Sequence, residues 1–336
     1  MMYRVAVVGG GSWGTTLANL IAEDGHPVDL WVWEEEVCRQ IRQERVNGVF
    51  LPGVKLSSNL RAVTNMEEAL HEKSLVLMVV PSHVFREVLI KMKPHLPPQA
   101  LVLSATKGIE NDSLMMMSQV CQDVIEGWDQ KRFGCLAGPS FAKEVCQHFP
   151  TAVTIACVNL NRAKELQRFL YREFFRIYVS DDVIGVQLAG ALKNVIAIGA
   201  GASDGLRFGH NARAALITRG LAEITRLGVA MGANPMTFAG LAGMGDLVLT
   251  CTGDLSRNRS VGLQIGQGRS LEEITRDMQM VAEGVKTARS AHELAKRYQV
   301  EMPITEQVYQ ILYKGKDPKA AVRDLMTRTL KSELDH

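Results

Sequence analysis

One lysine stands alone in a long apolar segment and is the residue of this sequence best suited to proton chemistry. Lys193, followed by Asn194, is the only charged residue between Asp182 and Asp204. Because an ammonium is costly to desolvate, it must be paired with a carboxylate, exposed at a cleft or held partly in its neutral form. In each case it can exchange a proton with a substrate oxygen. We therefore predict that Lys193 is catalytic, against the alternative of a lysine that reaches solvent from a helix end.

Two groups later in the chain could complete a site around this lysine. Asp246 lies in the small-residue passage 240–250, and it is a candidate partner for the Lys193 ammonium unless the passage is only a turn between helices. Ser256-Arg257-Asn258 offers hydroxyl, guanidinium and amide donors that match phosphate oxygens, although a solvated surface loop has the same composition. The net charge of +2 argues against a nucleic-acid binder, so we expect any bound anion to be held locally.

A glycine turn near the start of the chain has the spacing of a dinucleotide site. Gly9-Gly10-Gly11-Ser12-Trp13-Gly14 follows the apolar run 5–8 and precedes a helical run at 15–21. In such a turn Gly9 permits the sharp bend, Gly11 lets the backbone approach a pyrophosphate, and Gly14 lets the helix pack on the strand. The sequence therefore predicts NAD or NADP as cofactor, against the alternative of an ordinary glycine loop.

The preference between the two cofactors stays open. Trp33-Glu34-Glu35-Glu36 lies about twenty residues after the turn, where an acidic side chain favours NAD. Arg39, Arg42 and Arg45 follow, and the glutamates could equally be the solvated first turn of a helix.

Polar residues also follow two later apolar runs. Lys107 comes directly after the run 100–105, so it could reach a substrate oxygen at the edge of a sheet. Gly138 and Ser140 follow the run 133–137, where Ser140 with Glu144 could also be no more than the start of a helix.

These residues must be positioned by two domains of different classes. We predict strands at 4–8, 27–33, 75–80, 100–105 and 133–137, with two more at 151–157 and 174–179 that could close one edge of the same sheet. From about Asp181 the apolar spacing is helical. The fold class is therefore an α/β Rossmann domain with a mostly parallel, doubly wound sheet at 1–180, joined directly to an all-α substrate domain at 181–336, with the substrate expected between them.

Composition limits the remaining classes. With 46% hydrophobic and 22% charged residues the chain is that of a folded, soluble protein. Its six cysteines form no C-x-x-C pair, so we expect free thiols, no metal site and a cytoplasmic location, in agreement with an N-terminus that leaves no room for a signal peptide. The glycines, Gln187 and Lys193 within 183–203 favour a buried helix over a membrane span, and a homodimer is expected from the frequency of dimers alone.

Taken together, these blocks resemble the bacterial-type NAD(P)-dependent glycerol-3-phosphate dehydrogenases along nearly the whole chain. Besides the glycine turn, the resemblance rests on the segments Val80-Pro81-Ser82-His83, Ala105-Thr106-Lys107-Gly108, Gly138-Pro139-Ser140-Phe141-Ala142-Lys143-Glu144, Leu192-Lys193-Asn194-Val195, Gly243-x-Gly245-Asp246-Leu247 and Ser256-Arg257-Asn258-Arg259. It implies reversible reduction of dihydroxyacetone phosphate to sn-glycerol 3-phosphate for glycerophospholipid synthesis.

The resemblance also implies a set of site residues. It makes Lys193 the proton acceptor and implies that the phosphorylated substrate is surrounded by Lys107, Gly138, Ser140, Lys193, Asn194, Asp246, Ser256, Arg257 and Asn258. It implies a cofactor site of Gly9, Gly11, Ser12, Trp13, Gly14, Trp33, Lys107, Ala142, Arg257, Val281 and Glu283. Family members often carry another aromatic residue at position 13 and His or Arg near position 33, so Trp33 leaves the 2′-phosphate question open.

Two competing hypotheses remain. Another two-domain hydroxyacid or phosphosugar dehydrogenase would share the Rossmann half and a helical lysine, and the Ser256-Arg257-Asn258 donors argue for a phosphorylated substrate. A dinucleotide-sensing regulator without turnover would have no use for a lysine in a buried helix.

Overall fold

The computed structural model of the chain describes residues 3–278 and 282–333, which form two compact units. The first comprises Met1–Lys107 and Met115–Val183, and the second comprises Gly108–Leu114 and Ile184–His336. The predicted division after residue 180 lies just before the observed one. The grouping of Gly108–Leu114 with the second unit was not predicted. It follows from contacts such as the hydrogen bonds from the Ser290 hydroxyl to the carbonyl of Ile109 (3.2 Å) and to the side chain of Asn111.

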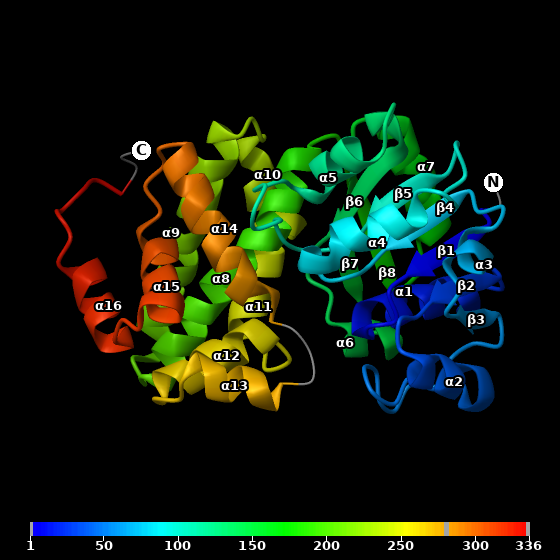
Figure 1. Cartoon of the computed structure of the whole chain (residues 1–336). Helices are drawn as coiled ribbons and strands as arrows, with labels where there is room; N and C mark the ends of the chain where they lie inside the picture. The colour runs from blue at the N-terminus through cyan, green and yellow to red at the C-terminus, as the bar shows by residue number, and fades with distance from the viewer. Residues whose placement is uncertain (1–2, 279–281, 334–336) are drawn as a thin grey trace. The chain divides into compact units, whose positions relative to one another are not determined.

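The first unit contains an eight-stranded sheet in the order β3-β2-β1-β4-β5-β6-β7-β8 (Figure 1). Neighbouring strands are parallel except for β6 and β7, which pair antiparallel. The strands are β1 (Val5–Val8), β2 (Val28–Trp31), β3 (Leu60–Val63), β4 (Leu75–Met78), β5 (Leu101–Ser104), β6 (Phe133–Ala137), β7 (Thr151–Cys157) and β8 (Phe175–Ser180). All seven predicted strands are present, and β7 and β8 do extend one edge of the sheet, so the predicted fold class is confirmed.

Strand β3 was missed by the sequence analysis. It has four residues, and Arg61 in its middle is exposed, so the segment lacks the apolar run that marked the other strands. It becomes a strand by pairing with β2, where Leu30 lies opposite Ala62. The pairing with β2, and not the local sequence, therefore determines that this segment is a strand.

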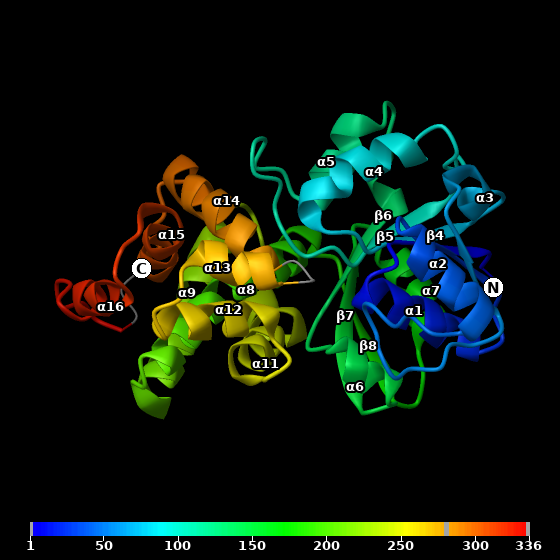
Figure 2. The same cartoon turned by 60° about the horizontal axis from the view of Figure 1, so that its bottom comes forward.

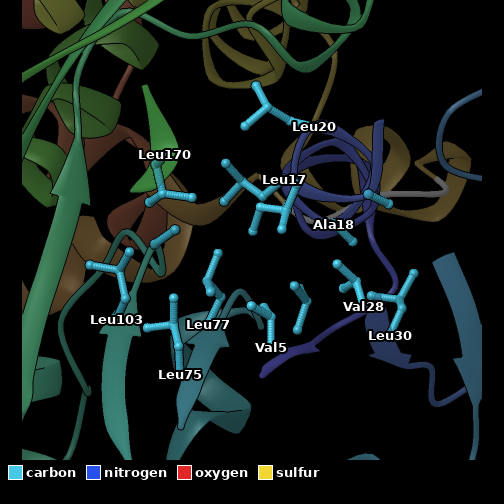
Figure 3. Close-up of a cluster of buried hydrophobic side chains, with 14 of the residues drawn as sticks. Val5, Leu17, Ala18, Leu20, Val28, Leu30, Leu75, Leu77, Leu103 and Leu170 are labelled. Carbon is cyan, nitrogen blue, oxygen red and sulfur yellow. The ribbon is translucent and has the colours of Figure 1, made fainter. Parts of the chain in front are cut away.

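Helices cover both faces of the sheet, because successive strand residues point to opposite sides and both sets are buried. Figure 3 shows one of these cores, in which Leu17 of α1 and Leu170 of α7 pack with Val5, Leu75 and Leu77 of the strands. Figure 2 shows α3, α4 and α5 on the opposite side. The helices of this unit are α1 (Ser12–Glu23), α2 (Glu35–Glu44), α3 (Met66–Leu70), η1 (Ser82–Val84), α4 (Phe85–Met92), α5 (Met117–Val124), η2 (Gln130–Arg132), α6 (Ala142–Cys146) and α7 (Leu160–Leu170).

Among the described residues of the second unit, the named secondary-structure elements are all helices, and Gly108–Leu114 belongs to none of them. Its helices are α8 (Val183–Gly205), α9 (Gly209–Ala230), α10 (Pro235–Ala239), the π-helix η3 (Leu241–Gly245), α11 (Asp246–Thr252), α12 (Arg257–Gly266), α13 (Leu271–Asp277), α14 (Glu283–Arg297), α15 (Pro303–Lys314) and α16 (Pro318–Met326). Helix α8 is enclosed by the others, whereas α16 lies at the periphery (Figure 1). Helix α8 is long and apolar enough to span a bilayer, but 89% of its most apolar window is buried inside the protein, as predicted for a core helix.

Helices α8 and α12 contact each other through two glycines on each helix, and the two are four residues apart. A β-carbon added at Gly201 or Gly205 of α8, or at Gly262 or Gly266 of α12, would lie 1.9–2.4 Å from a main-chain oxygen of the other helix. Only glycine permits such an approach, so the two backbones are in direct contact.

Neither a disulfide bond nor a group of metal ligands occurs among the described residues. All six cysteines are free thiols, as the sequence predicted, and five are buried. Within residues 3–278 and 282–333, no group of three or more His, Cys, Asp or Glu side chains is placed to hold a metal ion.

Candidate functional site

The glycine turn connects β1 to α1, and each of its key glycines meets a different constraint. Gly9 has a φ of +121°, and a β-carbon there would lie 2.5 Å from the carbonyl oxygen of Val79. A β-carbon at Gly14 would lie 1.9 Å from the carbonyl oxygen of Gly9. A β-carbon at Gly11 would meet no described atom within 4 Å. Gly9 and Gly14 are thus required by packing, whereas Gly11 leaves its backbone open on one side.

The start of α1 fits the pyrophosphate of a dinucleotide. Gly11 is the N-cap of α1 and provides no side-chain hydrogen bond to the first turn, so the positive end of the helix is left for another acceptor. Next to it, the indole Nε1 of Trp13 is buried and has no hydrogen-bond partner among the described residues. An open backbone, an uncapped helix and a buried unpaired donor are the features that a bound phosphate group would satisfy.

The other predicted residues of this unit follow strands whose carboxyl ends share an edge with β1. Strands β1, β4, β5 and β6 are parallel neighbours, so Lys107 after β5 and Gly138 after β6 lie at the carboxyl edge of the sheet, the edge at which open α/β sheets generally bind ligands. Gly138 has a φ of +145°, and Ser140 donates a hydrogen bond to its carbonyl at 3.0 Å. Ala142 begins α6, which packs on α1. Trp33 follows β2 and is 66% exposed.

Lys193 lies in the middle of α8 with only 6% of its surface exposed. Its ammonium forms an ion pair with Asp246, which is 1% exposed, and donates a hydrogen bond to the hydroxyl of Thr250 at 2.8 Å. Of the three environments that the sequence left open, the structure therefore shows the first, a charge paired with a carboxylate. The pair compensates a charge that would otherwise be very costly within an apolar helix.

The carboxylate is held in place by the π-helix that precedes it. A β-carbon at Gly243 would lie 2.1 Å from the carbonyl oxygen of Phe238, so the chain turns tightly against its own backbone before α11 begins at Asp246. Thr250, one helical turn later, donates to the main-chain carbonyl of Asp246 at 2.6 Å. The passage that could have been a simple turn therefore orients the partner of Lys193.

Thr250 was not singled out from the sequence, although it belongs to the same passage. Its position four residues after Asp246 in a helix is the signal that could have identified it, since residues at that spacing share a helix face.

The Ser256-Arg257-Asn258 cluster divides into two residues bonded within the protein and one exposed residue. Ser256 caps α12 by accepting from the main-chain N–H of Arg259 at 3.2 Å. Asn258 donates to the side chain of Asn194 at 2.9 Å and accepts from the main-chain N–H of Gly284 at 2.9 Å. Both therefore have structural partners that the sequence did not predict.

Arg257 is the exposed member, in the first turn of α12. Desolvation by surrounding protein lowers the pKa of its guanidinium although the side chain retains solvent contact, and the negative charge of Glu283 acts in the opposite direction. Glu283 begins α14, so the described start of this helix contributes both Glu283 and Gly284 to this region. Val281, also predicted to line the cofactor, lies outside the described residues.

Comparisons with known proteins agree over nearly the full length. The family described as NAD-dependent glycerol-3-phosphate dehydrogenase matches through its N-terminal part over residues 4–163 and its C-terminal part over residues 182–323. A curated glycerol-3-phosphate dehydrogenase, NAD(P)+, from Syntrophobacter fumaroxidans is 58% identical over 98% of this chain and 97% of its own length. One of the same name from Citrifermentans bemidjiense is 56% identical over 99% of each chain. The solved glycerol-3-phosphate dehydrogenase of Coxiella burnetii is 40% identical, with a TM-score of 0.93, over 97% of this chain and 99% of that chain.

Proposed function

Because the chain belongs to the NAD-dependent glycerol-3-phosphate dehydrogenase family, we propose that it catalyses reversible hydride transfer between NAD(P)H and dihydroxyacetone phosphate. The product in the direction of reduction is sn-glycerol 3-phosphate, a precursor for glycerophospholipids. The observation that carries the proposal is the buried ion pair between Lys193 of helix α8 and Asp246, with a hydrogen bond from Lys193 to Thr250.

The dinucleotide site is assigned to the first unit. The open backbone of Gly11, the uncapped start of α1 and the unpaired indole of Trp13 support binding of the pyrophosphate there. When bound, NAD(P)H supplies the hydride. Lys107, Ala142 and Trp33 of this unit are assigned to the cofactor as well, and Arg257 and Glu283 remain predicted cofactor residues.

Proton transfer is assigned to Nζ of Lys193. In the direction of reduction, Nζ gives its proton to the ketone oxygen of the substrate, which becomes the new hydroxyl group, and in the reverse direction Nζ takes that proton back. The Asp246 carboxylate and the Thr250 hydroxyl hold the ammonium in a fixed position for this proton transfer. Asp246 and Thr250 are therefore positioning residues for this step.

The phosphate group of the substrate is assigned to the first turn of α12. Arg257 is exposed there and supplies a guanidinium fork, while the start of a ten-residue helix supplies main-chain N–H groups and a positive dipole end. Ser256 and Asn258 contribute by fixing this turn to the protein. Lys107, Gly138, Ser140 and Asn194 remain predicted substrate residues.

Replacing Arg257 by Ala tests the phosphate assignment. We expect KM for dihydroxyacetone phosphate to rise by about tenfold to a hundredfold, the effect of losing a charge-assisted pair, with a smaller change in kcat. Steady-state kinetics at saturating dinucleotide measures both constants, and Arg276→Ala, on the neighbouring helix α13, is a matched control that should leave KM unchanged. An unchanged KM in the Arg257 variant would contradict the assignment.

The proposed function itself is tested by absorbance of the reduced nicotinamide. The purified chain should oxidise NADH or NADPH with dihydroxyacetone phosphate, and it should not form reduced cofactor from 6-phosphogluconate or 3-hydroxyisobutyrate. Absence of oxidation with dihydroxyacetone phosphate would overturn the proposal. Activity with 6-phosphogluconate or 3-hydroxyisobutyrate instead would assign the chain to another class of dehydrogenase. A homodimeric state and a cytoplasmic location remain predictions of the sequence.

A further inference from the structure

The segment that follows β2 presents an exposed aromatic ring held from one side by a cation. Trp33 is 66% exposed, and the ammonium of Lys91 in α4 lies 4.4 Å from the centre of its ring. An exposed indole has a flat apolar face on which an aromatic ligand can stack. At the carboxyl end of the second strand of a dinucleotide-binding unit, the ligand to expect is the adenosine half of the cofactor.

Glu34 is the next residue after Trp33, and among the described residues its carboxylate forms no hydrogen bond or ion pair. It is the N-cap of α2, but its side chain makes no capping hydrogen bond, and no ion pair within the described part of the chain includes it. Glu36, two residues later, differs because its carboxylate is bound by Arg39 and by Gln40. Glu34 thus offers an uncommitted carboxylate beside Trp33.

The arginines that could have bound a 2′-phosphate are engaged elsewhere. Arg39 holds Glu36 through two nitrogens, at 3.0 Å and 2.6 Å. Arg42 donates to the carbonyl of Ala62 and Arg45 to that of Leu60, each at 2.7 Å. Strand β3 is the edge of the sheet, so these two guanidinium groups complete the hydrogen bonding of its outward-facing carbonyls.

The cation that contacts Trp33 is Lys91, whose ammonium lies over the ring. A ribose 2′-hydroxyl can donate a hydrogen bond to a free carboxylate, whereas a 2′-phosphate would bring further negative charge next to it. Building on the proposed function, we propose that Glu34 is the specificity-determining residue of the cofactor site and that it selects NADH over NADPH, with Trp33 serving the part common to both.

Binding without turnover tests this selection. Isothermal titration of the full chain with NADH and with NADPH, in the absence of substrate, gives the ratio of the two dissociation constants. We expect the wild-type protein to bind NADH at least about tenfold more tightly, and Glu34→Gln to reduce that ratio by about tenfold, because the carboxamide keeps the shape and removes the charge.

Two variants distinguish selection by Glu34 from a general effect of charge. Glu35→Gln removes the same charge one residue later, and it should leave the ratio within about twofold of the wild-type value, because exposed charges a few ångströms further away are screened. Lys91→Met should weaken both dinucleotides by similar factors, since Lys91 supports the ring and not the ribose. A selective loss of NADPH binding in the Lys91 variant would overturn the proposal.

The remaining outcomes separate this inference from the function on which it rests. Equal or tighter binding of NADPH by the wild-type protein, or an unchanged ratio in Glu34→Gln, overturns the selection by Glu34 but leaves a dehydrogenase. Failure of both dinucleotides to bind overturns the proposed function itself.

Discussion

Two glycine-rich passages of similar composition have opposite surroundings. In the turn at residues 9–14, a β-carbon at Gly11 would meet no described atom within 4 Å, whereas at Gly243 the corresponding space is filled by the backbone of Phe238. The first passage ends in a helix start that has no side-chain cap, and the second ends in Asp246, which is fully engaged with Lys193 and Thr250. Gly11 thus leaves space next to the backbone in the first unit, whereas Gly243 allows two backbone segments to pack closely in the second.

The second unit contains another buried carboxylate besides Asp246, that of Glu223. Glu223 of α9 is 1% exposed and accepts hydrogen bonds from the main-chain N–H groups of Ile304 (2.6 Å) and Thr305 (3.1 Å) at the start of α15. The buried carboxylates of Asp246 and Glu223 are thus bonded by groups of their own unit, whereas the buried indole Nε1 of Trp13 has no partner among the described residues.

The largest expected effect follows from breaking the internal pair. Lys193→Met removes the proton donor, so we expect kcat to fall by about 10²–10⁴-fold while the dissociation constant for NADH is unchanged. Stopped-flow or steady-state absorbance measures the first and titration the second. Because the single substitution removes the ion-pair partner of the buried Asp246 carboxylate, Lys193→Met/Asp246→Asn should be equally inactive and better folded. Wild-type turnover in either variant would refute the role of Lys193.

The next effect concerns the pH dependence of stability. Desolvation raises the pKa of Glu223 to about 7 from 4.5, against the lowering effect of the hydrogen bonds from Ile304 and Thr305. The folded chain therefore holds this proton more tightly than the unfolded chain does, and the stabilisation present below pH 4.5 is lost as the pH rises through about 7. We expect Glu223→Gln to remove this loss, which is on the order of 3 kcal/mol. Denaturant unfolding of both proteins between pH 4.5 and pH 8 measures it, and parallel curves would contradict the assignment.

A smaller effect, on stability and on kcat, should come from adding a methyl group at Gly243, which packs against the backbone of Phe238. Gly243→Ala forces the backbone away from Phe238, and we expect a loss of about 1–3 kcal/mol in unfolding free energy, with reduced kcat because Asp246 shifts. Gly240→Ala is a matched control, since its β-carbon would approach only one atom, at 3.3 Å. Equal stability of the two variants would show that the passage is not closed as described.

The smallest effect, on cofactor binding, should come from adding a methyl group at Gly11, where the protein leaves space for it. Gly11→Ala has room in the protein alone, so its melting temperature should match the wild type, whereas the dissociation constant for NADH should rise by about tenfold because the added methyl group lies where a phosphate approaches. Calorimetry and titration test the two halves of this expectation. Unchanged NADH binding would remove Gly11 from the cofactor site.

The sequence predicted the strands of the sheet better than it predicted their edges. Buried parallel strands such as Leu75–Met78 are continuous apolar runs and are recognisable locally. Strand β3 is short, has Arg61 exposed at its centre, and exists because β2 offers it hydrogen bonds. The grouping of Gly108–Leu114 with the helices likewise depends on contacts with Ser290, which is distant in sequence.

At the candidate site, residue types were predictable and side-chain partners were only partly so. The isolation of Lys193 and the carboxylate at Asp246 could be read from composition, and the ion pair that was suggested between them is present. The hydrogen bonds of Asn258 to Asn194 and Gly284 could not be foreseen, because they depend on how α12 and α14 approach α8. A cluster of donors in sequence therefore did not reveal which donors the protein uses for itself.

The four glycines between α8 and α12 have a consequence for substrate size. Helix α8 carries Lys193, the proposed proton donor, and α12 begins with Arg257, the proposed phosphate ligand, so backbone contact between the two helices fixes the distance between these two residues. Neither helix can slide or separate without losing that contact. We therefore expect substrates with one carbon more or fewer between carbonyl and phosphate to be poor substrates, even though they carry both chemical groups.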